Sequence, residues 1–167
     1  MTTSTASANL LVALLVLPLL GGIVVALLRD DRVAKLVALA VSLVELALVI
    51  PTWLAYQPSG DRLQLVTSVD WIPEFGVRFA LGIDGIALVM IALIGLLVPI
   101  VIGGSWADKL PADRSAAGFY ALILVMQAGM VGVFAATDVF LFYVFFEAVL
   151  VPMYFLVGRF GGPRRQY

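Results

Sequence analysis

The sequence predicts an all-α integral membrane protein with five transmembrane helices. Of its 167 residues, 63% are hydrophobic and only 13% are charged, whereas a soluble domain has about 45–50% apolar and about 25% charged residues. The mean hydropathy is +1.11. Five stretches reach the ~20 apolar residues that a helix needs to cross a bilayer core of ~30 Å. Because hydrocarbon offers the backbone no hydrogen-bonding partner, each stretch must be helical.

The composition also limits the chemistry that the chain can perform. The net charge of −1 provides no basic field for nucleic acid. The absence of cysteine and histidine excludes disulfides, cysteine-held iron–sulfur clusters, histidine-ligated haem and the usual zinc sites. No phosphate-binding or dinucleotide-binding motif is present. We therefore expect no metal or cofactor in this chain, and any redox centre belongs to another chain.

The spans follow one another with short connections. They are Asn9–Leu28, Leu36–Tyr56, Gly85–Gly103, Ser115–Ala136 and Val139–Val157. Residues 1–8 are polar, and we expect a disordered tail there. Because the first span lacks the basic flank of a signal peptide, we expect it to be retained. Residues 9–157 thus form the membrane region, and residues 158–167 form a loop.

The basic residues predict the orientation. If the spans alternate in direction, eight of the ten Lys and Arg residues lie on one side. These eight are Arg29, Arg32, Lys35, Lys109, Arg114, Arg159, Arg164 and Arg165. Only Arg62 and Arg78 lie on the other side. Because basic loops stay in the cytoplasm, we expect the N-terminus outside and the short loops inside.

The long connection over residues 57–83 is then an outer loop. Apolar and polar residues alternate around Gln64 and again around Arg78, with Pro73 and Gly76 between them. This pattern is typical of a short β-hairpin. The simplest role for such a hairpin is to seal the outer ends of the helices.

Glu147 is the strongest candidate for a functional residue. It is the ninth residue of the fifth span, which places it about 13 Å into the membrane at 1.5 Å per residue. A charged group there costs at least ~2.5–3.5 kcal/mol, so its charge would respond to a cation that moved nearer or farther. We interpret Glu147 as a proton relay. The alternative is a protonated glutamate in an interhelical hydrogen bond.

Other residues within the spans are more ambiguous. Pro152 removes a helical hydrogen bond beside Glu147, and the bend could admit water or be an ordinary membrane-helix kink. Glu45, in the middle of the second span, could be a second relay site, a packing contact or a group reaching into a cavity, with packing favoured. We expect Gln127 to form an interhelical hydrogen bond. Asp84 and Asp138 each precede a span and are predicted N-caps.

Two motifs resemble a known family. The first is Trp71-Ile72-Pro73-x-Phe75-Gly76, followed by Asp84-Gly85-Ile86. The second is the run Phe142–Leu156, with its core Phe-Glu-Ala-x-Leu-x-Pro-Met around Glu147. Both are similar to subunit M of bacterial NADH–quinone oxidoreductase, respiratory complex I. The resemblance extends from about Asn9 to the end of the chain.

The resemblance implies a proton-pumping module of the membrane arm. In that family the glutamate matching Glu147 pairs with a lysine on a later helix, and its protonation is coupled to quinone reduction elsewhere. NADH, FMN, the iron–sulfur clusters and quinone would then be held by partner subunits. The partners implied are other membrane-arm subunits, the lipid bilayer and protons, in the bacterial plasma membrane. The family gives no role for Glu45.

The chain departs from the family in length. Family members are much longer, and their partner lysines follow the fifth helix. All ten basic residues here lie in loops or at helix ends, so we expect an N-terminal fragment that is inactive when isolated. The alternatives are a subunit of a multi-chain Na⁺/H⁺ antiporter, which shares the fold and the glutamate, or a non-catalytic membrane scaffold.

Overall fold

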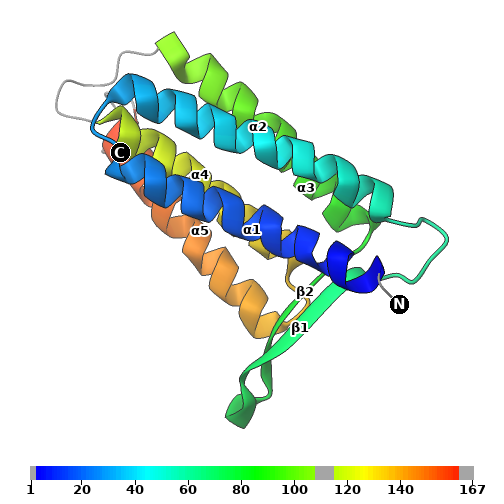
Figure 1. Ribbon diagram of the computed structural model, residues 1–167. Helices are drawn as coiled ribbons and strands as arrows, with labels where there is room; N and C mark the ends of the chain where they lie inside the picture. Colours follow the sequence, from blue (N-terminus) through cyan, green and yellow to red (C-terminus); the bar gives the residue numbers. More distant parts are fainter. Residues whose placement is uncertain (1–2, 108–114, 162–167) are drawn as a thin grey trace.

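A computed structural model describes residues 3–107 and 115–161 and confirms the predicted helices (Figure 1). Within these ranges, five helices are long and apolar enough to cross a membrane. They are α1 (Thr3–Leu27), α2 (Asp31–Ala55), α3 (Gly85–Gly104), α4 (Ala116–Ala135) and α5 (Val139–Phe160). Short 3-10 turns η1 (Pro73–Phe75) and η2 (Ser105–Ala107) complete the helical elements.

Two helices begin earlier than the hydropathy predicts. Residues 3–8 continue α1 as helix, so the prediction of a disordered tail is wrong for these six residues. The second helix begins at Asp31 rather than Leu36 because Asp30 caps it. The Asp30 carboxylate accepts hydrogen bonds from the backbone N–H groups of Arg32 at 2.8 Å and Val33 at 3.1 Å. Polar residues therefore extend both helices beyond their apolar spans.

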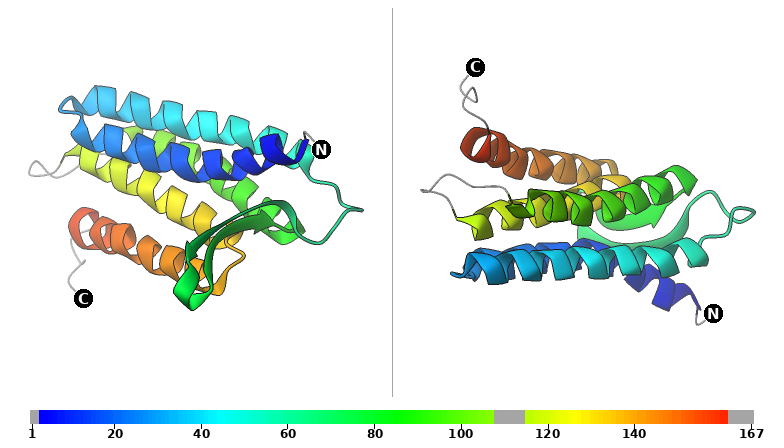
Figure 2. Two further views of the ribbon diagram at one scale, coloured as in Figure 1. Left: turned by 60° about the horizontal axis from the view of Figure 1, so that its bottom comes forward. Right: turned by 90° about the horizontal axis from the view of Figure 1, so that it is seen from above.

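The fourth helix is the centre of the bundle. It packs against α1, α2, α3 and α5, and the left view of Figure 2 shows it between α1 and α5. Small residues on α4 permit this close packing, as the sequence predicts. A Cβ built on Gly132 would lie only 2.5 Å from the Phe145 ring on α5, and one built on Gly129 would lie 2.6 Å from Val149.

The predicted hairpin is confirmed. Strands β1 (Gln64–Ile72) and β2 (Val77–Ile83) pair antiparallel, and the turn between them uses Gly76 at a φ of 66°, a region that favours glycine. The hairpin runs across one end of the bundle and reaches the start of α5 (Figures 1 and 2). There the Thr137 N–H donates to the Ala80 carbonyl at 2.9 Å.

The two ends of the bundle differ in charge. Arg29, Arg32, Lys35 and Arg159 lie where α1 and α5 end and α2 begins; we call this the inner end. Arg62 and Arg78 belong to the hairpin region at the opposite, outer end. The remaining basic residues lie outside the described ranges. The names follow the orientation that the basic residues predict.

Candidate functional site

Glu147 lies on the side of α5 that faces away from the bundle. Phe145 and Val149 point toward α4, where they meet Gly132 and Gly129. Glu147 stands two residues from each of them, which is about 200° around a helix. Its side chain is accordingly exposed in this structure. The described helices therefore leave the side of α5 that carries Glu147 open.

One neighbour on α5 shares this open face. Tyr143 precedes Glu147 by one helical turn, so the two side chains lie on the same side of α5. The Tyr143 side chain is 58% exposed. The hydroxyl can donate to the carboxylate while both groups stay available to a further partner. No lysine or arginine within the described part of α5 lies near Glu147, since Arg159 is at the far end of the helix.

The whole of α5 is open in the same way. Only Leu141 and Pro152 are buried among its residues. The helix is continuous through Pro152, so the proline does not interrupt it beside Glu147. The remaining apolar residues form a broad exposed face that includes Tyr154 at 73% and Val157 at 60%. In a membrane, such a face contacts lipid or further helices.

Glu45 has the opposite environment. It lies on the interior stripe of α2 and is only 1% exposed, so it does not reach toward water. Its Oε2 atom has no hydrogen-bond partner among the described residues. The neighbouring polar groups on this stripe, Ser42 and Thr52, are satisfied within their own helix by the Leu39 and Leu48 carbonyls.

Gln127 on α4 is also enclosed, and the prediction for it is wrong. Its side chain is fully buried, yet within the described ranges neither its Nε2 nor its Oε1 atom forms a hydrogen bond. The expected direct bond between helices is therefore absent among the described residues. A buried amide without a partner costs free energy, so Glu45 and Gln127 are the two unusual polar groups of the interior.

The two predicted N-caps are confirmed. Asp84 accepts from the Ala87 N–H at 2.8 Å at the start of α3. Asp138 accepts from the N–H groups of Phe140 and Leu141 at 2.9 and 3.1 Å, and also from that of Arg78 at 3.3 Å. These bonds, chiefly the one from Leu141, lower the pKa of Asp138 below its ordinary value. Asp138 thus ties the hairpin to α5.

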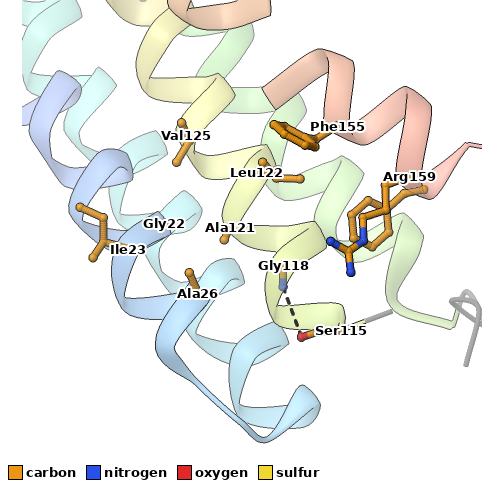
Figure 3. A pocket seen from close by; sticks show the side chains of 11 residues that line it. Gly22, Ile23, Ala26, Ser115, Gly118, Ala121, Leu122, Val125, Phe155 and Arg159 are labelled. Carbon is orange, nitrogen blue, oxygen red and sulfur yellow. Dashed lines mark hydrogen bonds between the residues drawn. The ribbon is translucent and has the colours of Figure 1, made fainter. Parts of the chain in front are cut away.

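A cavity of about 480 Å³ lies at the inner end between α1, α4 and α5. Figure 3 shows its apolar wall of small and aromatic side chains, with Arg159 at one side. Neither Glu45 nor Glu147 lines it. Proton transfer requires a titratable group whose pKa its surroundings shift. Because neither glutamate lines this mostly apolar cavity, we do not assign proton transfer to it.

Sequence reasoning missed two features of these sites. The first is that Glu45 belongs to an interior stripe, which the spacing of Ala34, Ala38 and Ser42 before it could have indicated. The second is the contact of Asp138 with the Arg78 backbone. No local pattern predicts that contact, since the two residues are 60 positions apart.

Comparison with known proteins finds relatives that match most of this chain. No protein-family model matches the chain. Subunit M of NADH-quinone oxidoreductase from Mycobacterium tuberculosis is 36% identical over 86% of this chain. Subunit M of the F420H2 dehydrogenase of Methanosarcina mazei is 35% identical over 92%, and an NAD(P)H-quinone oxidoreductase chain 4 of Microcystis aeruginosa is 35% identical over 98%. The chain spans 29–31% of the length of these relatives.

Solved structures confirm the fold. A structure of the Mrp complex from a Dietzia species matches 95% of this chain with a TM-score of 0.69 and 22% identity, and the match covers 16% of that chain. The membrane-bound sulfane sulfur reductase, an archaeal respiratory membrane complex, matches 87% with a TM-score of 0.68 and 20% identity, covering 22% of that chain. The structural matches show the fold. The sequence matches show that the chain is similar to subunit M or chain 4 of NADH-quinone oxidoreductase, NAD(P)H-quinone oxidoreductase and F420H2 dehydrogenase, over 29–31% of their length.

Proposed function

We propose that this chain is part of a proton-translocating membrane subunit of NADH–quinone oxidoreductase, in which Glu147 carries the proton. The single observation that supports this most directly is the position of Glu147. It lies in the middle of a membrane-length helix, on a face that the described helices leave open, in a chain whose relatives extend well beyond it. The remaining part of a longer subunit would supply the other wall of the site and a cationic partner.

The electron-transfer groups belong to other subunits in this proposal. The chain has no cysteine or histidine with which to hold a redox metal. NADH, FMN, the iron–sulfur clusters and quinone would therefore be bound by partner subunits, and the isolated chain would be inactive. The partners are the other membrane-arm subunits, and the location is the bacterial plasma membrane.

Proton transfer at Glu147 would depend on its surroundings. Removal from water favours the protonated carboxyl, and an approaching cation favours the carboxylate. A moving cation would thus load and unload one proton on Glu147. Tyr143, one helical turn from Glu147 on the same side of α5, would orient the carboxyl by donating a hydrogen bond to it. The exposed face of α5 would become buried against the helices that carry the cation.

The test is Glu147→Gln in the full-length complex. Glutamine keeps the size and polarity of the side chain and removes its titration, so NADH-driven proton pumping should fall to near background while the complex still assembles. Vesicle acidification and assembly on native gels give the two readings. The control is Glu74→Gln on the exposed hairpin turn, which should pump normally. Normal pumping by an assembled Glu147→Gln complex would reject the proposal.

The Na⁺/H⁺ antiporter remains the second candidate. It is favoured only by the Mrp likeness, which at 22% identity shows the fold alone. The relatives at 35–36% identity bear quinone-oxidoreductase or dehydrogenase names. Genes for small antiporter subunits beside this one, instead of peripheral dehydrogenase subunits, would favour the antiporter.

A further inference from the structure

The interior of the bundle contains a polar site that the proposed function does not use. Glu45 on α2 and Gln127 on α4 are both buried, and both carry side-chain atoms without a partner in the described structure. Helices α2 and α4 are in contact with each other. The two side chains can share one site only if they lie at the same depth along the bundle axis. Contacts of α1 with both helices allow their depths to be compared.

Adjacent glycines of α1 give the depth of both helices. A Cβ built on Gly21 would lie 2.6 Å from Val41 on α2. A Cβ built on Gly22 would lie 2.9 Å from Val125 and 3.1 Å from the Ala121 carbonyl on α4. Because Gly21 and Gly22 are neighbours in the chain, Val41 lies level with the turn of α4 between Ala121 and Val125.

The same register places the two polar residues side by side. Both α2 and α4 run from the inner to the outer end. Glu45 follows Val41 by four residues. Gln127 likewise follows Ile123, the middle residue of the 121–125 turn, by four residues. Each is therefore about 6 Å farther outward along its helix. Two buried polar side chains thus lie at one depth on contacting helices.

A proline in α1 adds a backbone acceptor at this depth. Pro18 lies three residues outward from Gly21 and is buried inside α1, close to the level of Glu45. Because proline has no N–H, the Leu14 carbonyl cannot accept the usual helical bond. Leu14 is fully buried, so this carbonyl lies on the interior side of the helix.

A proline in α3 leaves a second backbone carbonyl without its helical hydrogen bond at this depth. A Cβ built on Gly95 would lie 2.9 Å from Val49 on α2, and the two helices run in opposite directions. Pro99 lies four residues inward from Gly95, as Glu45 lies four residues inward from Val49. Pro99 is buried, and it deprives the Gly95 carbonyl of its helical bond. Two backbone carbonyls therefore accompany the two side chains.

No charged group faces Glu45 from the helices packed against it. Helices α1, α3 and α4 contact α2, and over their described residues they contain no Asp, Glu, Lys or Arg. Their one titratable side chain is Tyr120, whose hydroxyl contacts Ser105. A carboxylate without a cation is costly in such a place, and a neutral carboxyl that is hydrogen-bonded is not.

We propose that Glu45 and Gln127, with the carbonyls of Leu14 and Gly95, form a hydrated proton-binding site inside the α1–α4 bundle, separate from Glu147. The proton resides on the Glu45 carboxyl, and water bridges that carboxyl to the Gln127 amide. A buried water makes about three hydrogen bonds, and this site offers both donors and acceptors. The Gln127 Nε2 group requires an acceptor, which water provides and a metal cation does not.

A double-substitution cycle tests whether the two residues share a site. Glu45→Leu and Gln127→Leu should each lower the unfolding temperature of the assembled full-length protein, because each leaves the other group without its partner. The double variant should lower it by less than the sum. Ser42→Ala is the matched control, since Ser42 bonds within its own helix, and its effect should add to that of Gln127→Leu. Simple addition for Glu45 and Gln127 would overturn the shared site.

Infrared difference spectroscopy tests the proton and the water. The wild type minus Glu45→Gln should show the carbonyl stretch of a protonated carboxyl, and Glu147→Gln identifies any band that belongs to the other glutamate. The Glu45 band should shift in D₂O, and it should move in Gln127→Leu. Should Glu45→Gln fail to fold, Glu45→Asp displaces the same band. A carboxylate band, a band unmoved by D₂O, or a shift caused by Na⁺ would each reject the site as proposed. No step requires proton pumping, so this result is independent of the Glu147 test.

Discussion

The two membrane glutamates differ in almost every respect except their depth. Glu45 is enclosed by helices that are all present in this chain, and it lacks a polar partner among them. Glu147 is exposed on a helix of which only two residues are buried. The comparison shows that α1–α4 enclose a carboxyl in their common interior, whereas α5 carries its carboxyl on an open face.

The difference also separates two ways of accommodating a carboxyl in a membrane. At Glu45, the packed helices α1, α3 and α4 surround the carboxyl, so in the proposed site the protonated form stays in one environment. At Glu147, the described helices leave the carboxyl exposed, and in the proposed pump its surroundings would change as a cation moved nearer or farther. A site whose environment changes is suited to coupling, and a site whose environment is fixed is suited to storage.

The largest expected loss of stability comes from placing a cation at the buried position of Glu45. Glu45→Lys would place an unpaired ammonium among apolar helices, which should destabilise the fold by at least about 3 kcal/mol. Glu147→Lys should disturb the folding of this chain much less, because its side chain leaves the bundle. The amount of folded chain extracted from membranes and its unfolding temperature measure both. Equal losses for the two variants would remove the distinction between enclosed and open positions.

A smaller effect should follow from crowding the contact between α4 and α5. In Gly132→Ala the new Cβ would lie 2.5 Å from the Phe145 ring, so the helices must separate, at a cost of about 1–3 kcal/mol. Gly158→Ala on α5 is the control. A Cβ there meets nothing within 4 Å, and alanine favours helix, so stability should be unchanged or slightly raised. Thermal unfolding in detergent provides the measurement. Matching changes in the two variants would show that α5 is not held through this face.

The helices and the hairpin could be predicted from sequence because their signals are local. Apolar length specifies a membrane helix, and alternation around a Pro-Gly turn specifies a hairpin. The start of α2 could be predicted less well, because the Asp30 cap lies outside the apolar span. Sequence also identified Glu147 and Glu45 as unusual.

Hydropathy alone could not predict the difference between the environments of the two glutamates. Both are acidic residues in the middle of an apolar span, and hydropathy treats them alike. Which face of α2 is interior depends on the packing of α1, α3 and α4 around it. The failed expectation for Gln127 has the same origin, since the groups that meet its side chain are set by the packing of the other helices around α4.

The smallest expected effect concerns the attachment of α5 to the hairpin. Asp138→Ala removes the acceptor for the N–H groups of Phe140, Leu141 and Arg78, whereas the control Asp84→Ala removes only that of Ala87. Hydrogen exchange should therefore accelerate at α5 and in the hairpin in the Asp138→Ala variant, and only at α3 in the Asp84→Ala variant.

The pH dependence of the Asp138 contribution has a definite sign. Because the fold lowers the pKa of Asp138, its stabilising contribution is complete above the ordinary carboxyl pKa and is lost as the pH falls through the lowered value. Protection of the Phe140, Leu141 and Arg78 amides should decline over that acidic range in the wild type and stay flat in Asp138→Ala. If the wild type and the variant exchanged alike at every pH, the Asp138 carboxylate would not contribute to holding the hairpin against α5.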